Sequence, residues 1–123
     1  MDSTNERAVS FYGSIFSNIL LPNEILLNAA PAIHVEMSEK NGKGTGDGTI
    51  AITNLRVIHI YSAAIFKSPG FAFNRSDISS SSKNWIVLPG SSNLKFTGNS
   101  NGAPWTHNFY CSKNFCKEVT EWL

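Results

Sequence analysis

Cysteine, charge and long apolar runs are all scarce in this chain of 123 residues. Two cysteines allow at most one bridge, which excludes a disulfide-scaffolded fold. Charged residues make up 15% and hydrophobic residues 41%, a balance that excludes an intrinsically disordered chain. No apolar run approaches the ~18 residues of a membrane-spanning helix. The N-terminus lacks the basic start of a secretory signal, so we expect a cytoplasmic protein.

The length fits one domain, residues 1–123, with a core large enough to need no metal or disulfide. The net charge of +1 is unevenly distributed, because residues 1–39 hold five acids against one base and residues 40–95 hold seven bases against two acids. Such a local excess could attract an anionic lipid or an acidic partner, but it is too small to indicate a general nucleic-acid binder.

Residues 1–21 are predicted to form an amphipathic helix. Ser3 and Glu6 have the spacing of a capping box, and Pro22 ends the helix. Apolar residues recur at three- and four-residue intervals: Ala8, Phe11, Tyr12, Ile15, Phe16, Ile19 and Leu20. This stripe must be covered, so we expect it to pack on its own domain or, second, to form a homodimer. Phe11, Ile15 and Phe16 are the candidate residues for contact with a partner.

The period changes to two after the helix, which indicates strands. The alternation over 24–38 predicts the first strand, and the glycine-rich segment 39–48 predicts a loop. Further strands are expected at 49–53, 56–61, 70–78, 84–88, 93–97 and 105–110. The serine run 79–82 is interpreted as a loop. Residues 113–123 close the chain as an amphipathic helix with Ser112 as its N-cap.

Two segments resemble a known family. Residues 48–58, with Thr53-Asn54-Leu55-Arg56 between two apolar stretches, are similar to the "Thr-Asn-x-Arg" motif of GRAM and bacterial PH-like domains. Residues 21–26 are similar to the entry into their first strand. The resemblance covers 22–123 and implies a mainly β, PH-like fold: a seven-stranded bent antiparallel barrel closed by the C-terminal helix, with Trp122 packed against it. Asn54 is expected to tolerate left-handed backbone in the turn.

The resemblance implies a non-catalytic binding module for a protein segment or a lipid. Phosphoinositide-binding PH domains carry alternating bases on the strand after the first loop, and 49–53 carries none. A protein partner is therefore favoured, with weak binding of anionic lipid at the membrane periphery as the lesser option. Candidate anion-binding residues are Lys40, Lys43, Arg56 and Lys67. For Arg56, hydrogen bonds to loop carbonyls are favoured over ligand binding.

No catalytic constellation, metal site or cofactor motif is apparent, so an enzyme is not expected. His34, His59 and His107 lack metal-ligand spacing and are expected to face solvent, although a cross-strand pair of His34 and His59 stays open. Cys111 and Cys116 are expected to be free thiols.

The alternative function is a barrel that binds a small ligand or single-stranded nucleic acid. It rests on aromatic residues interleaved with bases; these aromatic residues are Phe71, Phe73, Trp85 and Phe96. In a small barrel such aromatic residues more often form the core than a surface on which bases stack, so this hypothesis ranks second.

Overall fold

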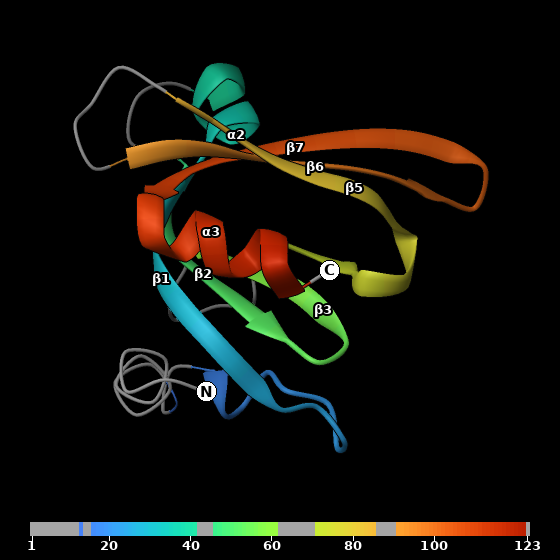
Figure 1. Ribbon diagram of the computed structural model, residues 1–123. Helices are drawn as coiled ribbons and strands as arrows, with labels where there is room; N and C mark the ends of the chain where they lie inside the picture. The colour runs from blue at the N-terminus through green and yellow to red at the C-terminus, as the bar shows by residue number, and fades with distance from the viewer. Residues whose placement is uncertain (1–12, 14–15, 42–45, 62–70, 86–90, 123) are drawn as a thin grey trace.

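The computed structural model describes residues 13, 16–41, 46–61, 71–85 and 91–122 (Figure 1). Over these residues the fold is mainly β, as predicted, with seven strands and a C-terminal helix. The elements are β1 (Leu26–His34), α2 (Val35–Asn41), β2 (Asp47–Thr53), β3 (Arg56–Tyr61), β4 (Phe71–Asn74), the 3-10 turn η2 (Arg75–Asp77), β5 (Ile78–Trp85), β6 (Ser91–Ser100), β7 (Ala103–Ser112) and α3 (Lys113–Trp122). No helix among these residues is long and apolar enough to cross a membrane.

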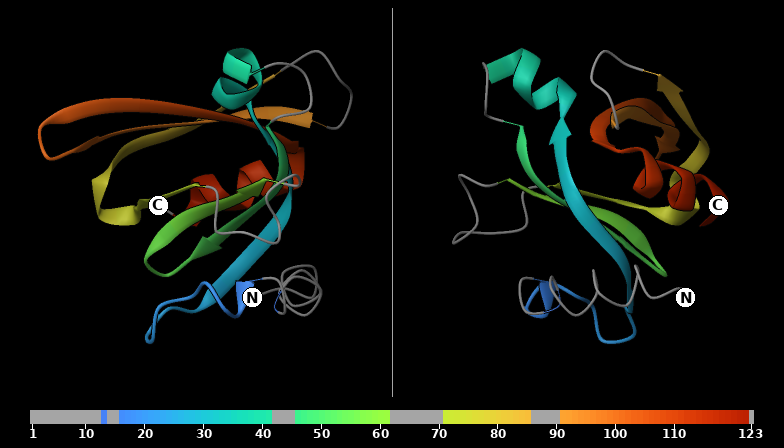
Figure 2. Two further views of the ribbon diagram at one scale, coloured as in Figure 1. Left: turned by 180° about the vertical axis from the view of Figure 1, so that it is seen from behind. Right: turned by 60° about the vertical axis from the view of Figure 1, so that its left-hand side comes forward.

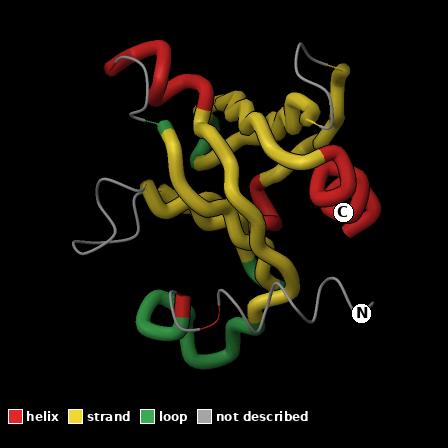
Figure 3. Tube along the Cα trace, turned by 90° about the vertical axis from the view of Figure 1, so that its left-hand side faces the viewer, coloured by secondary structure: helices red, strands yellow, loops and turns green. Residues whose placement is uncertain are grey.

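All seven strands belong to one antiparallel sheet with the order β4-β3-β2-β1-β7-β6-β5. The first strand therefore pairs with both the second and the last, and it joins the two halves of the sheet. The halves bend toward each other, and α3 lies between them (Figures 1 and 2). The tube in Figure 3 shows the segment before β1 at the foot of the β1–β3 half.

The expected closure of the barrel is wrong. β4 and β5 are the two ends of the sheet and do not pair with each other. The short turn η2 leads the chain directly from one end strand into the other, and they diverge from there. The opening is filled by α3, whose Phe115, Cys116 and Val119 are buried in the main core.

Two further predictions for individual segments are wrong. Residues 35–41 form α2 and not the end of a strand; Glu36 in its first turn and Lys40 in its last suit the helix dipole. The serine run 79–82 lies inside β5, because pairing with β6 overrides the weak strand preference of serine. The predicted strand 84–88 lies largely outside the described residues.

The predicted N-terminal helix also lies largely outside the described residues. Within it, Gly13 and Phe16 are helical, and residues 17–20 form turns. Phe16 is fully buried against the β1–β3 face of the sheet, in a small core with Leu26, Ala29, Ala51, Ile58 and Ile60. This contact agrees with the expectation that the segment packs on its own domain.

The opposite face of the sheet carries the larger core. It combines aliphatic and aromatic side chains from β1–β4, β6, β7 and α3, including Phe96 and Phe109. The predicted N-cap is confirmed, since Ser112 Oγ accepts a hydrogen bond from Phe115 N at 3.2 Å. Trp122 is half-buried against this core, and the Arg75 guanidinium stacks on its ring at 4.5 Å.

Left-handed backbone occurs at the β6–β7 turn and not at Asn54. Asn101 and Gly102 have φ angles of 54° and 84° and form its two-residue loop. Asparagine and glycine are the residues that such a hairpin turn favours.

Candidate functional site

The Thr-Asn-x-Arg motif holds the segment that precedes β1. Glu24 is buried, and its carboxylate accepts hydrogen bonds from Arg56 Nε at 2.8 and 3.0 Å and from Thr53 Oγ1 at 2.6 Å. Arg56 Nη2 donates to the carbonyl of Ile19 at 2.9 Å. Burial alone would raise the pKa of Glu24, but the hydrogen bonds from Arg56 and Thr53 outweigh it and lower the pKa. We call Glu24, Thr53, Asn54 and Arg56 the clamp.

Asn54 completes the clamp through its side chain. Its Oδ1 accepts from Ile25 N at 2.7 Å, and its Nδ2 donates to the carbonyl of Asn23 at 3.1 Å. The side chain of Arg56 is only 15% exposed. The expectation that Arg56 bonds a loop carbonyl is confirmed, and in this arrangement its guanidinium is engaged within the chain.

Of the other residues predicted to bind a ligand or partner, the structure describes Lys40 and Phe16. Lys40 is exposed in the last turn of α2. Lys43 and Lys67 lie outside the described residues, as do Phe11 and Ile15 of the N-terminal stripe. Phe16 is buried within the chain.

The three histidines converge instead of facing solvent, so the expectation of solvent-facing histidines is wrong. His34 and His59 are 4% and 0% exposed, and His107 is half-buried. The reason is the pairing of β1 with β7, which sets His34 opposite Phe109 and brings His107, two residues before Phe109, to the same face. Sequence spacing gives no sign of this pairing between the first and last strands.

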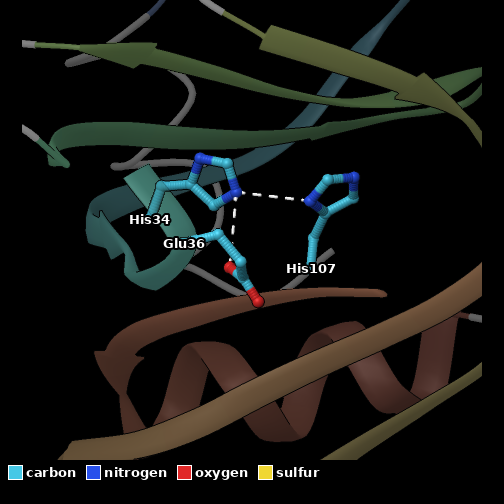
Figure 4. Close-up of side chains that lie close together, drawn as sticks. All are labelled: His34, Glu36 and His107. Atoms are coloured by element: carbon cyan, nitrogen blue, oxygen red, sulfur yellow. Dashed lines mark hydrogen bonds and ion pairs between the residues drawn. The ribbon is translucent and has the colours of Figure 1, made fainter. Parts of the chain in front are cut away.

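His34 contacts both His107 and Glu36 (Figure 4). Its Nε2 is 3.3 Å from His107 Nδ1 and 3.5 Å from Glu36 Oε2, while its Nδ1 is 2.7 Å from the hydroxyl of Tyr61. The imidazole of His34 stacks on Phe109, with ring centroids 4.9 Å apart. We call His34, Glu36 and His107 the histidine–glutamate cluster.

Burial keeps these imidazoles neutral. It lowers the pKa of His34 to about 4, although the charge of Glu36 acts in the opposite direction. The pKa of His107 is also lowered by burial, again against the effect of Glu36. At neutral pH each ring therefore carries one nitrogen with a free electron pair.

His59 lies beside the cluster without joining it. Its Nε2 is 3.0 Å from the carbonyl of Ala32, and burial lowers its pKa. Its Nδ1 is buried with no hydrogen-bond partner among the described residues. The predicted alternative of a His34–His59 pair corresponds to a ring contact with centroids 6.0 Å apart.

A polar groove of about 440 Å³ lies between β5 and α3, beside the unclosed end of the sheet. Five of its six lining residues are polar: the lining consists of Arg75, Ile78, Ser79, Ser80, Ser81 and Thr120. The sequence did not predict this groove, because the serine run that lines it was interpreted as a loop.

The structure also tests the predictions for the cysteines and the aromatic residues. Cys111 and Cys116 form no disulfide, as expected, and are buried with their sulfurs 2.9 Å apart. The hydrogen bond to Cys116 and burial raise the pKa of Cys111. Phe73 and Phe96, from the predicted stacking aromatics, are buried in the main core.

The comparisons with known proteins address the fold. No protein-family model and no curated protein matches the chain. Among solved structures, the chain is similar to a "Vps36 N-terminal PH domain", with a TM-score of 0.56 and 14% sequence identity over 85% of this chain and 82% of that one. At such identity the likeness concerns the fold alone. Together with the sheet order and the position of α3, it shows that the fold is PH-like.

Proposed function

We propose that this chain is a non-catalytic binding module that takes up an extended segment of a partner protein along β5 and the adjoining groove. The observation that carries the proposal is the combination of an end strand with a polar groove at its side. The unpaired main-chain groups of an end strand bind an added strand, and side-chain pockets give such binding its specificity.

β5 suits this role better than the other end strand. It has eight residues, whereas β4 has only four, and short end strands resist pairing with another chain. Serine side chains on β5 leave room for an incoming segment, and their hydroxyls, with Thr120 from α3, supply hydrogen-bonding groups.

The finer assignment to GRAM-like or bacterial PH-like domains rests on the motif at 53–56, whose side chains form the clamp. Because the clamp engages Arg56, the motif supports a role in the scaffold and not in ligand capture. The buried thiols of Cys111 and Cys116 form no disulfide, which suits a reducing compartment, so we place the module in the cytoplasm.

The test selects binding peptides from a random displayed library with the full chain as bait. We expect peptides whose affinity falls at least about tenfold, or about 1.4 kcal/mol, in Thr120→Trp, which fills the groove. The control is Asn114→Trp, an exposed position on the same helix that does not line the groove. Bound peptide should also slow amide exchange in β5.

Anionic vesicles provide the second arm. Binding of the chain to phosphatidylserine vesicles, abolished in the Lys40→Glu/Lys43→Glu variant and unchanged in Thr120→Trp, would support the lipid alternative. That result, with no groove-dependent peptide from the library, overturns the proposal.

A further inference from the structure

The histidine–glutamate cluster brings three metal-ligating groups together from three elements. His34 ends β1, Glu36 is in the first turn of α2, and His107 is on β7. One nitrogen from each histidine and one oxygen of Glu36 all lie within 4.8 Å of one another. Figure 4 shows the carboxylate and the His107 ring both directed toward Nε2 of His34.

Two of the spacings among these atoms suit a tetrahedral metal ion, and the third lies within 4.8 Å. Zinc binds imidazole nitrogen and carboxylate oxygen at about 2.0–2.1 Å, so two ligands of a tetrahedral site lie about 3.3–3.4 Å apart. The two contacts of His34 Nε2 measure 3.3 Å to His107 Nδ1 and 3.5 Å to Glu36 Oε2. We propose that His34, Glu36 and His107 bind one zinc ion and leave its fourth position open to water or a ligand.

Groups around the cluster form hydrogen bonds to His34 and to Glu36. With Nε2 of His34 on the metal, its Nδ1–H donates to the Tyr61 hydroxyl 2.7 Å away. Glu36 accepts hydrogen bonds from the backbone N of Asn108 at 3.0 and 3.1 Å and from its Nδ2 at 2.5 Å. Such outer hydrogen bonds set the tautomer of a ligating histidine and hold a ligating carboxylate.

The donor set selects the class of metal. Two neutral imidazoles and one carboxylate suit zinc and similar transition metals, whereas magnesium and calcium require oxygen ligands. The site is also accessible, because Glu36 and His107 are only half-buried while His34 is 4% exposed. An ion can therefore reach the buried nitrogen from the side of Glu36.

A competing account needs no metal. Tyr61 could donate to Nδ1 of His34, and Nε2–H of His34 could donate to His107 or Glu36 at the same distances. The two hypotheses differ in what happens when zinc is added, because only the zinc-site hypothesis predicts a stable complex. Neither depends on the peptide groove, so this inference stands or fails separately from the proposed function.

The test is a calorimetric titration with zinc of the full chain, from which metal has first been removed by a chelator. We expect one zinc per chain and a loss of affinity of more than about 100-fold in Glu36→Gln and in His107→Phe, which keeps an aromatic ring among Phe71, Phe73 and Trp105. Tyr61→Phe, which removes only the outer hydroxyl, should weaken binding about 10–100-fold. Glu39→Gln, an exposed position on the same helix, is the matched control and should bind as the parent does.

Cobalt supplies a readout of geometry. Co²⁺ in the site should give the intense visible bands of tetrahedral nitrogen and oxygen ligation, without thiolate charge transfer, and zinc should remove them. No saturable binding, or equal affinity in the parent, Glu36→Gln and His107→Phe with each variant folded, overturns the proposal. A thiolate band also overturns it, because it assigns the metal to Cys111 or Cys116.

Discussion

The two ends of β1 carry polar clusters of opposite character. At its start, each polar group of the clamp has a partner within the chain: the Glu24 carboxylate binds Arg56 and Thr53, and the Asn54 amide binds Asn23 and Ile25. At its end, the nitrogens of His34 and His107 face each other 3.3 Å apart beside a carboxylate. The first cluster holds a segment in place, whereas the second brings two imidazole nitrogens and a carboxylate oxygen within 4.8 Å of one another.

The difference shows what burial of polar residues does in each place. A buried charge is tolerated when it is paired and hydrogen-bonded, and the Glu24–Arg56 pair meets that requirement. Neutral imidazoles carry no such charge, so they are buried at lower cost and keep their ability to bind a metal. We therefore assign the clamp to stability and the histidine–glutamate cluster to binding.

The largest effect is expected at the clamp. Arg56→Ala removes the partner of a carboxylate whose side chain is 0% exposed, so it should lower the free energy of unfolding by about 3–5 kcal/mol. Urea denaturation measures the loss, and Lys40→Ala, an exposed position, should change it by less than about 0.5 kcal/mol. A loss below about 1 kcal/mol for Arg56→Ala would contradict the role of the clamp.

A smaller effect is expected on the pH dependence of stability. The pKa of Glu24 is lowered from its usual 4.5, so the folded state binds this proton less readily than the unfolded state. The stabilisation is present above about pH 4.5 and is lost as the pH falls through the folded pKa. The stability difference between the parent and Glu24→Gln should therefore shrink between pH 6 and pH 3 in urea titrations. A difference that stays constant over this range would show that Glu24 is not held as a carboxylate.

The smallest effect is expected at the thiols. Cys111 and Cys116 are soft ligands only 2.9 Å apart, but both are buried, and the pKa of Cys111 is raised. Thiols bind zinc as thiolates, so we expect zinc to bind the imidazoles and not this pair of cysteines. Cys116→Ala should keep the zinc affinity of the parent within about twofold in the same calorimetric titration. A tenfold loss of zinc affinity would show that the cysteines, and not the histidines, bind the metal.

The sequence predicted the fold well where patterns are local. Alternating apolar residues predicted most strands, and the apolar face at 115–122 predicted α3. The motif at 53–56 predicted the PH-like fold and the structural bond of Arg56. The loop prediction for 79–82 was wrong, because pairing with β6 decides the conformation of residues that prefer turns.

The histidine–glutamate cluster could not be predicted because its members come from opposite ends of the chain. His34 and His107 are 73 residues apart and meet only because β1 pairs with β7. Spacing within one element, which is what a sequence shows directly, carries no information about that pairing. The hydrogen bond from Asn108 to Glu36 depends on the same strand contact.

The most direct test of this contrast is the nitrogen NMR spectrum of the histidine side chains before and after one equivalent of zinc. The account predicts large shifts for Nε2 of His34 and Nδ1 of His107, little change for His59, whose Nε2 lies against the Ala32 carbonyl, and no change in the Arg56 Nε resonance of the clamp. Unchanged His34 and His107 signals, or a zinc shift confined to His59, would contradict it.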